Sequence, residues 1–121
     1  MSTERSRKEA GKCPFKKNDV FTFTYTIGVD VTAVILTTIE QRLSGDIIGS
    51  RRVVCYGDDH CLYICKLTYR RKYFAGCVPA GEENPVVLDK VLNISLFQSN
   101  VEIPECDGII RDYKERQQLE L

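Results

Sequence analysis

The chain of 121 residues lacks most of the features that would identify its chemistry directly. It has one histidine, His60, and no net charge, because 17 Lys and Arg balance 17 Asp and Glu. It contains no apolar run long enough to span a bilayer. Nothing in the overall charge therefore demands nucleic acid or an anionic membrane as a partner. No phosphate-binding loop, dinucleotide-binding glycine motif, G-x-S-x-G or H-E-x-x-H occurs, which excludes the enzyme classes those motifs mark.

Cysteine is unusually frequent in this chain for its length. An even count of six in so short a chain favours disulfides and an oxidising compartment. A zinc site would need close C-x-x-C or C-x-x-H pairs, which are missing, so we predict neither a metal nor a cofactor. A cytosolic protein with free thiols stays open as the alternative. The sequence does not decide the pairing of Cys13, Cys55, Cys61, Cys65, Cys77 and Cys106.

The first twelve residues, MSTERSRKEAGK, are predicted to be a flexible basic tail. They lack the apolar core of a secretory signal peptide. If the cysteines indicate secretion, we expect that a signal segment has been removed and that Met1 is an expression start.

The next thirty residues carry two different hydrophobic periods. Residues 19–27 alternate, with Phe21 and Phe23 on one side and threonines on the other, which predicts a half-buried strand. Residues 30–44 follow a 3.6-residue stripe, with Asp30 as N-cap and Gly45 after the last turn, which predicts one helix. Its apolar stripe consists of Val31, Val34, Ile35, Thr38, Ile39 and Leu43.

From residue 53 onward the pattern is strand and turn. We expect strands at 53–56, 61–69, 86–88 and 91–97, a turn at 56–60, a loop at 75–85 and a tight hairpin at Asp89-Lys90. Residues 108–121 are predicted to be a charged C-terminal extension, for which a weakly amphipathic helix is one interpretation. The predicted fold is α+β, with a single helix packed on a four- to five-stranded antiparallel sheet. Besides the helix stripe, the predicted core contains Phe21, Phe23, Leu62, Ile64, Leu92, Ile94 and Leu96.

Two groups of residues could carry function. His60 lies in the turn Y-G-D-D-H, where it is either a solvated turn residue or, with Asp58 or Asp59, a general acid–base centre. A run of basic residues interleaved with tyrosines suits contact with RNA or another partner, and the alternative is a solvated hairpin tip that protects a sheet edge. That run consists of Lys66, Tyr69, Arg70, Arg71, Lys72 and Tyr73.

The segments LYICKL, FAGCVPAG, PVVL, VLNISL and IPEC, in that order, resemble the back half of the fungal guanyl-specific ribonucleases. The segment YTIGVDVTAV at 25–34 is similar to the opening of that family's helix, so the resemblance covers roughly residues 20–106. This chain departs from the family at its catalytic positions. Where the family has a catalytic glutamate, arginine and histidine, this chain has Ile64, Pro85 and Phe97, which cannot exchange protons. The resemblance therefore implies no catalytic residues and no enzyme activity.

A ribonuclease fold without its active site is similar to the RNase-like secreted effectors of cereal powdery mildew fungi. This resemblance implies a ribonuclease-like domain at 13–107, closed by a Cys13–Cys106 disulfide. It also implies a secreted virulence or avirulence effector that enters the plant cell and binds host proteins, with an intracellular immune receptor as one candidate. Three alternatives stay open: a non-catalytic RNA-binding module, an active nuclease with a relocated site, and an unrelated disulfide-rich ligand or inhibitor.

Overall fold

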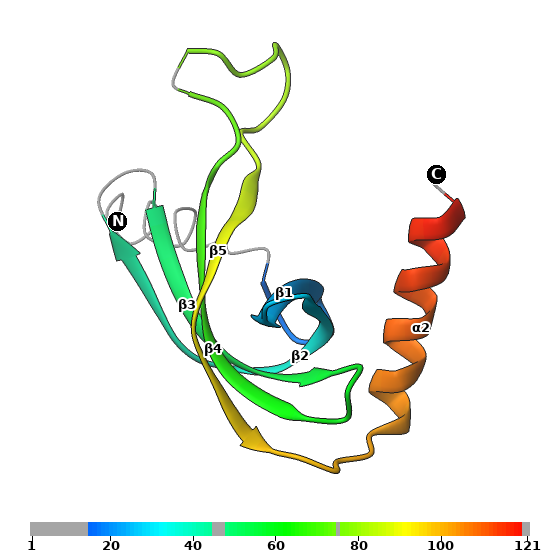
Figure 1. Cartoon of the computed structure of the whole chain (residues 1–121). Helices are drawn as coiled ribbons and strands as arrows, with labels where there is room; N and C mark the ends of the chain where they lie inside the picture. The colour runs from blue at the N-terminus through cyan, green and yellow to red at the C-terminus, as the bar shows by residue number, and fades with distance from the viewer. Residues whose placement is uncertain (1–14, 45–47, 75, 120–121) are drawn as a thin grey trace.

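The computed structural model describes residues 15–44, 48–74 and 76–119. In those ranges five strands form one sheet and a single helix follows them: β1 (Val20–Thr26), β2 (Val29–Ser44), β3 (Ile48–Gly57), β4 (Leu62–Arg71), β5 (Val86–Gln98) and α2 (Pro104–Leu119). The sheet order is β1-β2-β3-β4-β5, and each neighbouring pair is antiparallel. The sheet curls nearly into a barrel, and α2 stands beside it (Figure 1). The predicted class, one helix on an antiparallel sheet, is confirmed.

The sheet buries side chains on both faces, which divides the core into two clusters. The inner cluster fills the curl of the sheet with aromatic, aliphatic and thiol side chains from β1 to β4 and with partly buried side chains of β5. The outer cluster joins Val34 of β2 and Tyr56 of β3 to Cys106 and Ile110 of α2. Burial of such side chains is the main favourable term in folding. The inner cluster consists of Phe15, Phe21, Phe23, Val31, Ala33, Ile35, Val53, Cys55, Tyr63, Cys65, Leu67 and Tyr69.

The predicted helix at 30–44 is wrong, because these residues form most of strand β2. Residues 31–35 are buried without a break, since β2 lies between β1 and β3 with an apolar cluster on each face. A strand buried on both faces has no polar alternation, and a short apolar run of this kind also fits a helix. The β-branched residues of this segment favour the strand once neighbouring strands are available to pair with it.

The predicted hairpin at Asp89-Lys90 is also wrong, because β5 continues through both residues. Its pairing with β4 shifts register at three places, and these irregularities keep one long strand attached to a bent sheet. Leu92 and Leu96, predicted to be core residues, are 39% and 48% exposed. The strand predicted at 53–56 is longer than expected and spans all of β3. The predicted strands at 19–27 and 61–69 and the turn that precedes Cys61 are confirmed.

The helix lies at the C-terminal end of the chain, in the region predicted to be a charged extension. The predicted boundary between residues 107 and 108 falls inside α2, whose Cys106 and Ile110 are buried against β2 and β3. Within the described ranges no helix is long and apolar enough to cross a membrane. The predicted basic tail at residues 1–12 lies outside the described residues.

Candidate functional site

The turn between β3 and β4 holds His60 in a fixed backbone conformation. Its φ of 62° is left-handed, which is uncommon for a residue other than glycine. Its amide donates to the carbonyl of Gly57 at 3.0 Å, and its own carbonyl accepts from the amide of Val101 at 2.9 Å. Because both sides of the peptide are held, the turn fixes the backbone from which the His60 side chain projects.

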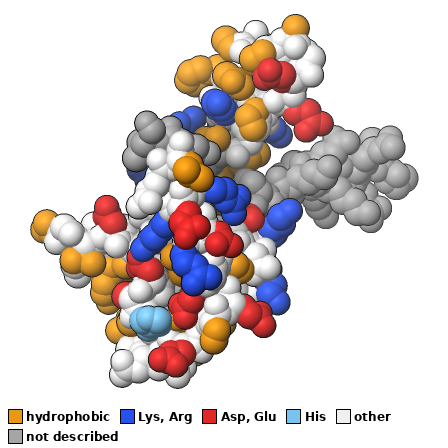
Figure 2. Space-filling model, turned by 90° about the vertical axis from the view of Figure 1, so that its right-hand side faces the viewer, with side chains coloured by type: hydrophobic (Ala, Val, Ile, Leu, Met, Phe, Trp, Pro, Cys, Tyr) orange, Lys and Arg blue, Asp and Glu red, His pale blue; other side chains and the backbone are white. Residues whose placement is uncertain are grey.

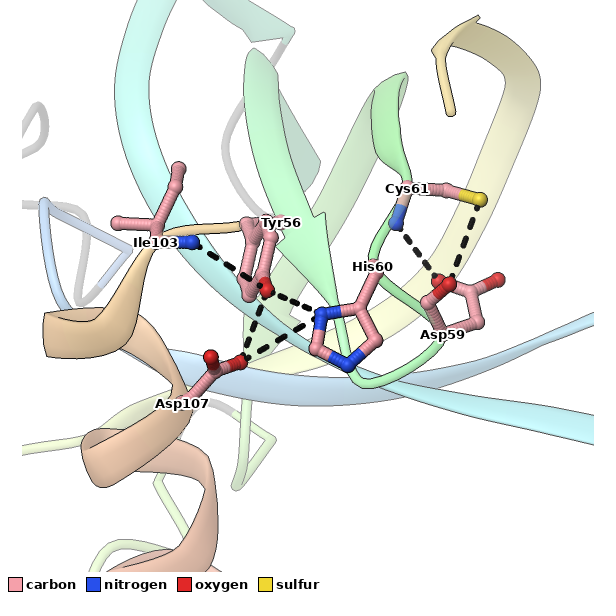
Figure 3. A network of polar contacts seen from close by, with 6 residues as sticks. All are labelled: Tyr56, Asp59, His60, Cys61, Ile103 and Asp107. Carbon is pink, nitrogen blue, oxygen red and sulfur yellow. Dashed lines mark hydrogen bonds and ion pairs between the residues drawn. The ribbon is translucent and has the colours of Figure 1, made fainter. Parts of the chain in front are cut away.

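Three polar side chains meet between this turn and α2 (Figure 3). The hydroxyl of Tyr56 donates to Oδ1 of Asp107 at 2.8 Å and lies 2.7 Å from Nδ1 of His60. The same oxygen accepts from the backbone amide of Ile103 at 3.5 Å. Burial raises the pKa of Tyr56 to about 12, and its hydrogen bond to Asp107 acts in the same direction. Tyr56 therefore stays a neutral hydroxyl through the physiological range.

An open hollow of about 370 Å³ lies beside this cluster. The turn contributes Asp58 and His60 to the lining of this hollow. Helix α2 contributes Asp107 and further residues one to three turns closer to its C-terminus. Lys114 of α2 donates to Oδ2 of Asp58 at 2.7 Å, which ties the helix to the turn a second time. Figure 2 shows acidic and basic side chains interleaved on this side of the molecule, with the single histidine exposed at its edge. The remaining lining residues are Ile110, Arg111, Glu115 and Gln118.

The two aspartates predicted as partners of His60 are separated by the turn. Asp58 shares the hollow with His60, whereas Asp59 accepts hydrogen bonds from the Tyr63 hydroxyl and the Cys61 amide. Tyr63 belongs to the inner cluster, and both burial and Asp59 raise its pKa. Neither aspartate makes a hydrogen bond to His60 among the described residues. The carboxylate nearest the imidazole is Asp107, whose Oδ1 lies 3.9 Å from Nδ1.

One member of the basic run predicted to bind RNA or a partner is not at the surface. Tyr69 is 4% exposed and packs edge-on against Phe15 in the inner cluster, so it cannot stack on a base. The prediction that Tyr69 is a binding residue is wrong. Lys66 is half-buried and lies directly opposite Arg52 of β3, so two basic residues are neighbours across this pair of strands.

The other members of the run interact with their own surroundings. Arg70 donates to Asp89 at 3.3 Å, and Arg71 donates to the backbone carbonyl of Asn84 at 3.4 Å. The ammonium of Lys72 lies 5.4 Å from the ring centre of the half-buried Tyr73. These contacts lie at the base of the β4–β5 loop, which extends beyond the sheet in Figure 1.

The five described cysteines have free thiols. Cys55 and Cys65 are buried on neighbouring strands of the inner face, and their mutual hydrogen bond together with burial raises the pKa of Cys55. Burial also raises the pKa values of Cys61 and Cys106. Cys13 lies outside the described residues, so the Cys13–Cys106 disulfide stays a prediction. No group of three or more His, Cys, Asp or Glu able to hold a metal ion occurs in the described part of the chain.

A second hollow, of about 380 Å³, lies between the two edge strands, β1 and β5. Residues 22–24 of β1 and residues 88–91 of β5 form its sides. Phe23, Leu88, Val91 and Ile94 belong to the inner cluster or pack against it, so they give this groove an apolar floor. We call it the edge groove. It opens where the curled sheet does not close on itself.

The sequence did not single out Tyr56 or Asp107 as site residues. They are 51 positions apart and come together only because α2 packs on the outer face of the sheet. No family model, no curated protein and no solved structure matches this chain.

Proposed function

We propose that this protein acts by binding a partner protein, and that the edge groove receives an extended segment of that partner. The observation that carries this proposal is the position of the groove between two sheet edges. Edge strands present backbone amides and carbonyls that another strand can pair with. An extended segment in the groove would gain such hydrogen bonds and bury apolar side chains on the floor, as in other cases of β-strand addition.

The topology also supports a direction for the bound segment. Four successive antiparallel pairings make β1 and β5 run in the same sense. A sixth strand that is antiparallel to one edge is therefore antiparallel to the other, and it would extend an up-and-down meander. Alternate side chains of that strand would point to the floor, so its sequence would alternate apolar and polar residues.

The two edges differ in how regular they are. The pairing of β1 with β2 is continuous from Val20 to Thr24 and shifts only after that residue. Strand β5 carries register shifts next to Leu62, Cys65 and Tyr69 of its partner β4. Bulges of this kind protect an edge from pairing. We therefore expect the backbone hydrogen bonds to form mainly along β1, with β5 contributing side chains.

The predicted secreted effector of a plant pathogen is the narrower form of this proposal. Its partner would be a host plant protein, with an immune receptor as one candidate. The ribonuclease resemblance behind it has less support in the fold, because the segment likened to that family's helix is part of β2. Secretion, a host partner and the loss of ribonuclease activity stay predictions. The RNA-binding alternative loses support because Tyr69 is buried and Arg70 is paired.

The test places a photo-crosslinking residue at the exposed position Thr22, at the side of the edge groove. The protein is irradiated in RNase-treated plant leaf extract, and the adducts are identified by mass spectrometry. We expect a protein adduct that is lost when Val91→Glu puts a charge on the groove floor. The matched control is Leu119→Glu, at an exposed apolar position at the end of α2, which should keep the adduct.

Folding of each variant is checked by circular dichroism and thermal melting before the crosslinking comparison. An adduct whose yield is the same in Val91→Glu as in the unmodified protein would contradict the groove as the binding surface. The absence of any protein adduct at Thr22 would contradict the host-protein form of the proposal.

A further inference from the structure

The hydrogen bonds around Tyr56 determine which nitrogen of His60 carries a proton. A phenol has one hydrogen to donate, and an ionised carboxylate can only accept. The hydroxyl of Tyr56 donates to Asp107, at 2.8 Å, and its oxygen accepts from the amide of Ile103. Nδ1 of His60 lies 2.7 Å from the same oxygen, so it must be the donor of that bond.

The other ring nitrogen of His60, Nε2, is therefore free to accept a proton. A neutral imidazole that holds its proton on Nδ1 has its lone pair on Nε2. The imidazole lines the open hollow, and the side chain is 52% exposed. The order carboxylate, phenol, imidazole thus orients Nε2 in the way that a buried aspartate orients a catalytic histidine through its Nδ1 hydrogen.

The lining of the hollow carries charges of both signs, with Arg111 and Lys114 on α2 as its cations and Asp58, Asp107 and Glu115 as its carboxylates. Lys114 is paired with Asp58, whereas Arg111, one turn nearer the N-terminus of α2, has no ion pair among the described residues. A guanidinium is suited to bind a carboxylate in a bidentate manner. Arg111 lines the same hollow as His60, so a small molecule seated there could contact both.

We propose that this hollow is a hydrolytic site in which His60 is the general base and Arg111 binds a carboxylate of a small ester. Nε2 accepts a proton from water as the water oxygen bonds to the ester carbonyl carbon. The tetrahedral intermediate then breaks its bond to the alkoxide or phenolate, which leaves with the electron pair. The imidazolium returns its proton to the leaving group or to solvent, giving one acid and one alcohol. Asp107, acting through Tyr56, stabilises the charge on the ring. This site is separate from the edge groove and does not depend on partner binding.

The first test concerns the proton on His60 and needs no substrate. Because the chain has one histidine, ¹⁵N–¹H spectra of the imidazole show a single residue. At a pH where histidine is neutral, we expect the proton on Nδ1. Tyr56→Phe removes the acceptor and should move the proton to Nε2, whereas Tyr113→Phe, a conservative change on α2 outside the hollow, should leave it on Nδ1.

Asp107→Asn supplies a second, independent variant for the same measurement. An amide can donate as well as accept, so the direction of the Tyr56 hydrogen is no longer imposed and a mixture of both tautomers is expected. The matched control is Asp112→Asn, an exposed residue of the same helix that does not line the hollow. A proton on Nε2 in the unmodified protein would overturn the proposal.

The second test measures hydrolysis of p-nitrophenyl acetate and of 4-acetoxy-3-nitrobenzoate, which carries a carboxylate. We expect His60→Ala to lower kcat/KM for both esters by about 10²-fold. Arg111→Gln should raise KM for the carboxylated ester alone. Tyr56 is a positioning residue, so Tyr56→Phe should both lower kcat and move the proton on His60 to Nε2. Tyr113→Phe should change neither kcat nor the position of the proton. Equal rates for His60→Ala and the unmodified protein would refute the hydrolytic role, whatever the tautomer.

Discussion

The hydroxyl of Tyr56 and the carboxylate of Asp107 lie 2.8 Å apart, although 51 positions separate them in the chain. This bond attaches the first turn of α2 to the outer face of β3. The tyrosine is fully buried, so its hydroxyl depends on protein partners.

Replacement of Tyr56 by phenylalanine should destabilise the protein. The change removes the hydrogen bonds to Asp107 and to the amide of Ile103. Because Asp107 is 40% exposed and can bond to water instead, we expect a cost of about 0.5–1.5 kcal/mol in the free energy of unfolding. Urea denaturation followed by circular dichroism measures the change. Tyr113→Phe, whose hydroxyl makes no hydrogen bond among the described residues, is the control and should cost much less. Equal stability of the Tyr56→Phe variant and the unmodified protein would contradict this role.

The protein should lose stability in alkaline solution earlier than a chain without buried phenols. The pKa of Tyr56 in the folded protein is raised to about 12, against about 10 for an exposed tyrosine. A group whose pKa is raised by folding contributes its full stability below the unfolded pKa and loses it as the pH rises through the folded pKa. The free energy of unfolding should therefore fall from about pH 10 to pH 12.

Two measurements check this alkaline loss. Thermal melting across that pH range should show a shallower decline for Tyr56→Phe than for the unmodified protein. Absorbance of tyrosinate should show that some of the six tyrosines ionise late, because the pKa of Tyr63 is raised as well. Ionisation of all six at the pH of free tyrosine, with the fold intact, would contradict the burial of these phenols.

Two glycine-to-alanine substitutions should have opposite effects on stability. A Cβ at Gly49 of β3 would lie 2.6 Å from the ring of Tyr69, which is buried and cannot move aside. We expect Gly49→Ala to destabilise the protein by about 1–3 kcal/mol. A Cβ at Gly108 of α2 meets nothing closer than 3.8 Å, so Gly108→Ala should stabilise the helix by about 0.5–1 kcal/mol. Denaturation midpoints compare the two, and a stabilised Gly49→Ala would contradict the packing of Tyr69 on β3.

The free thiols should differ widely in reactivity in the native protein. Cys77 is exposed in the β4–β5 loop, whereas Cys55, Cys65 and Cys106 are buried, and the raised pKa values of Cys55 and Cys106 disfavour the reactive thiolate. Brief alkylation followed by peptide mass spectrometry should label Cys77 first. Labelling of Cys55 at the same rate, without unfolding, would contradict its place in the core. The same map made without reduction tests the predicted Cys13–Cys106 disulfide.

The parts of the fold that the sequence predicted correctly are those with one buried face. In β1, Phe21 and Phe23 alternate with exposed threonines, and in β4 the buried Tyr63 and Cys65 alternate with half-buried neighbours. Such alternation identifies a strand without knowledge of its partners. In β2 the signal fails because Val31, Val34 and Ile35 are buried against different elements on opposite faces.

In the candidate site, too, the local sequence identifies some residues, whereas others are identified only by the packing of distant segments. His60 could be noted from the sequence, because it is the only histidine and lies in a turn. Its partners Tyr56 and Asp107 could not, since a tyrosine at the end of a strand and an aspartate in a charged helix carry no signal of their own. Tyr69 was misjudged for a related reason: a tyrosine among basic residues resembles a binding surface until its neighbours in the sheet bury it.

Local alternation and turn residues, which act over a few positions, were enough to predict an antiparallel sheet built from neighbours in the chain. The predicted class of one helix on that sheet agrees with the structure, but the helix was predicted at 30–44 and lies at Pro104–Leu119. Packing between distant segments makes residues 30–44 a strand, places α2 against the outer face of the sheet, and brings a phenol, an imidazole and a carboxylate together. Those outcomes depend on which surfaces cover both faces of the sheet, and burial between distant segments is a property of the folded chain as a whole.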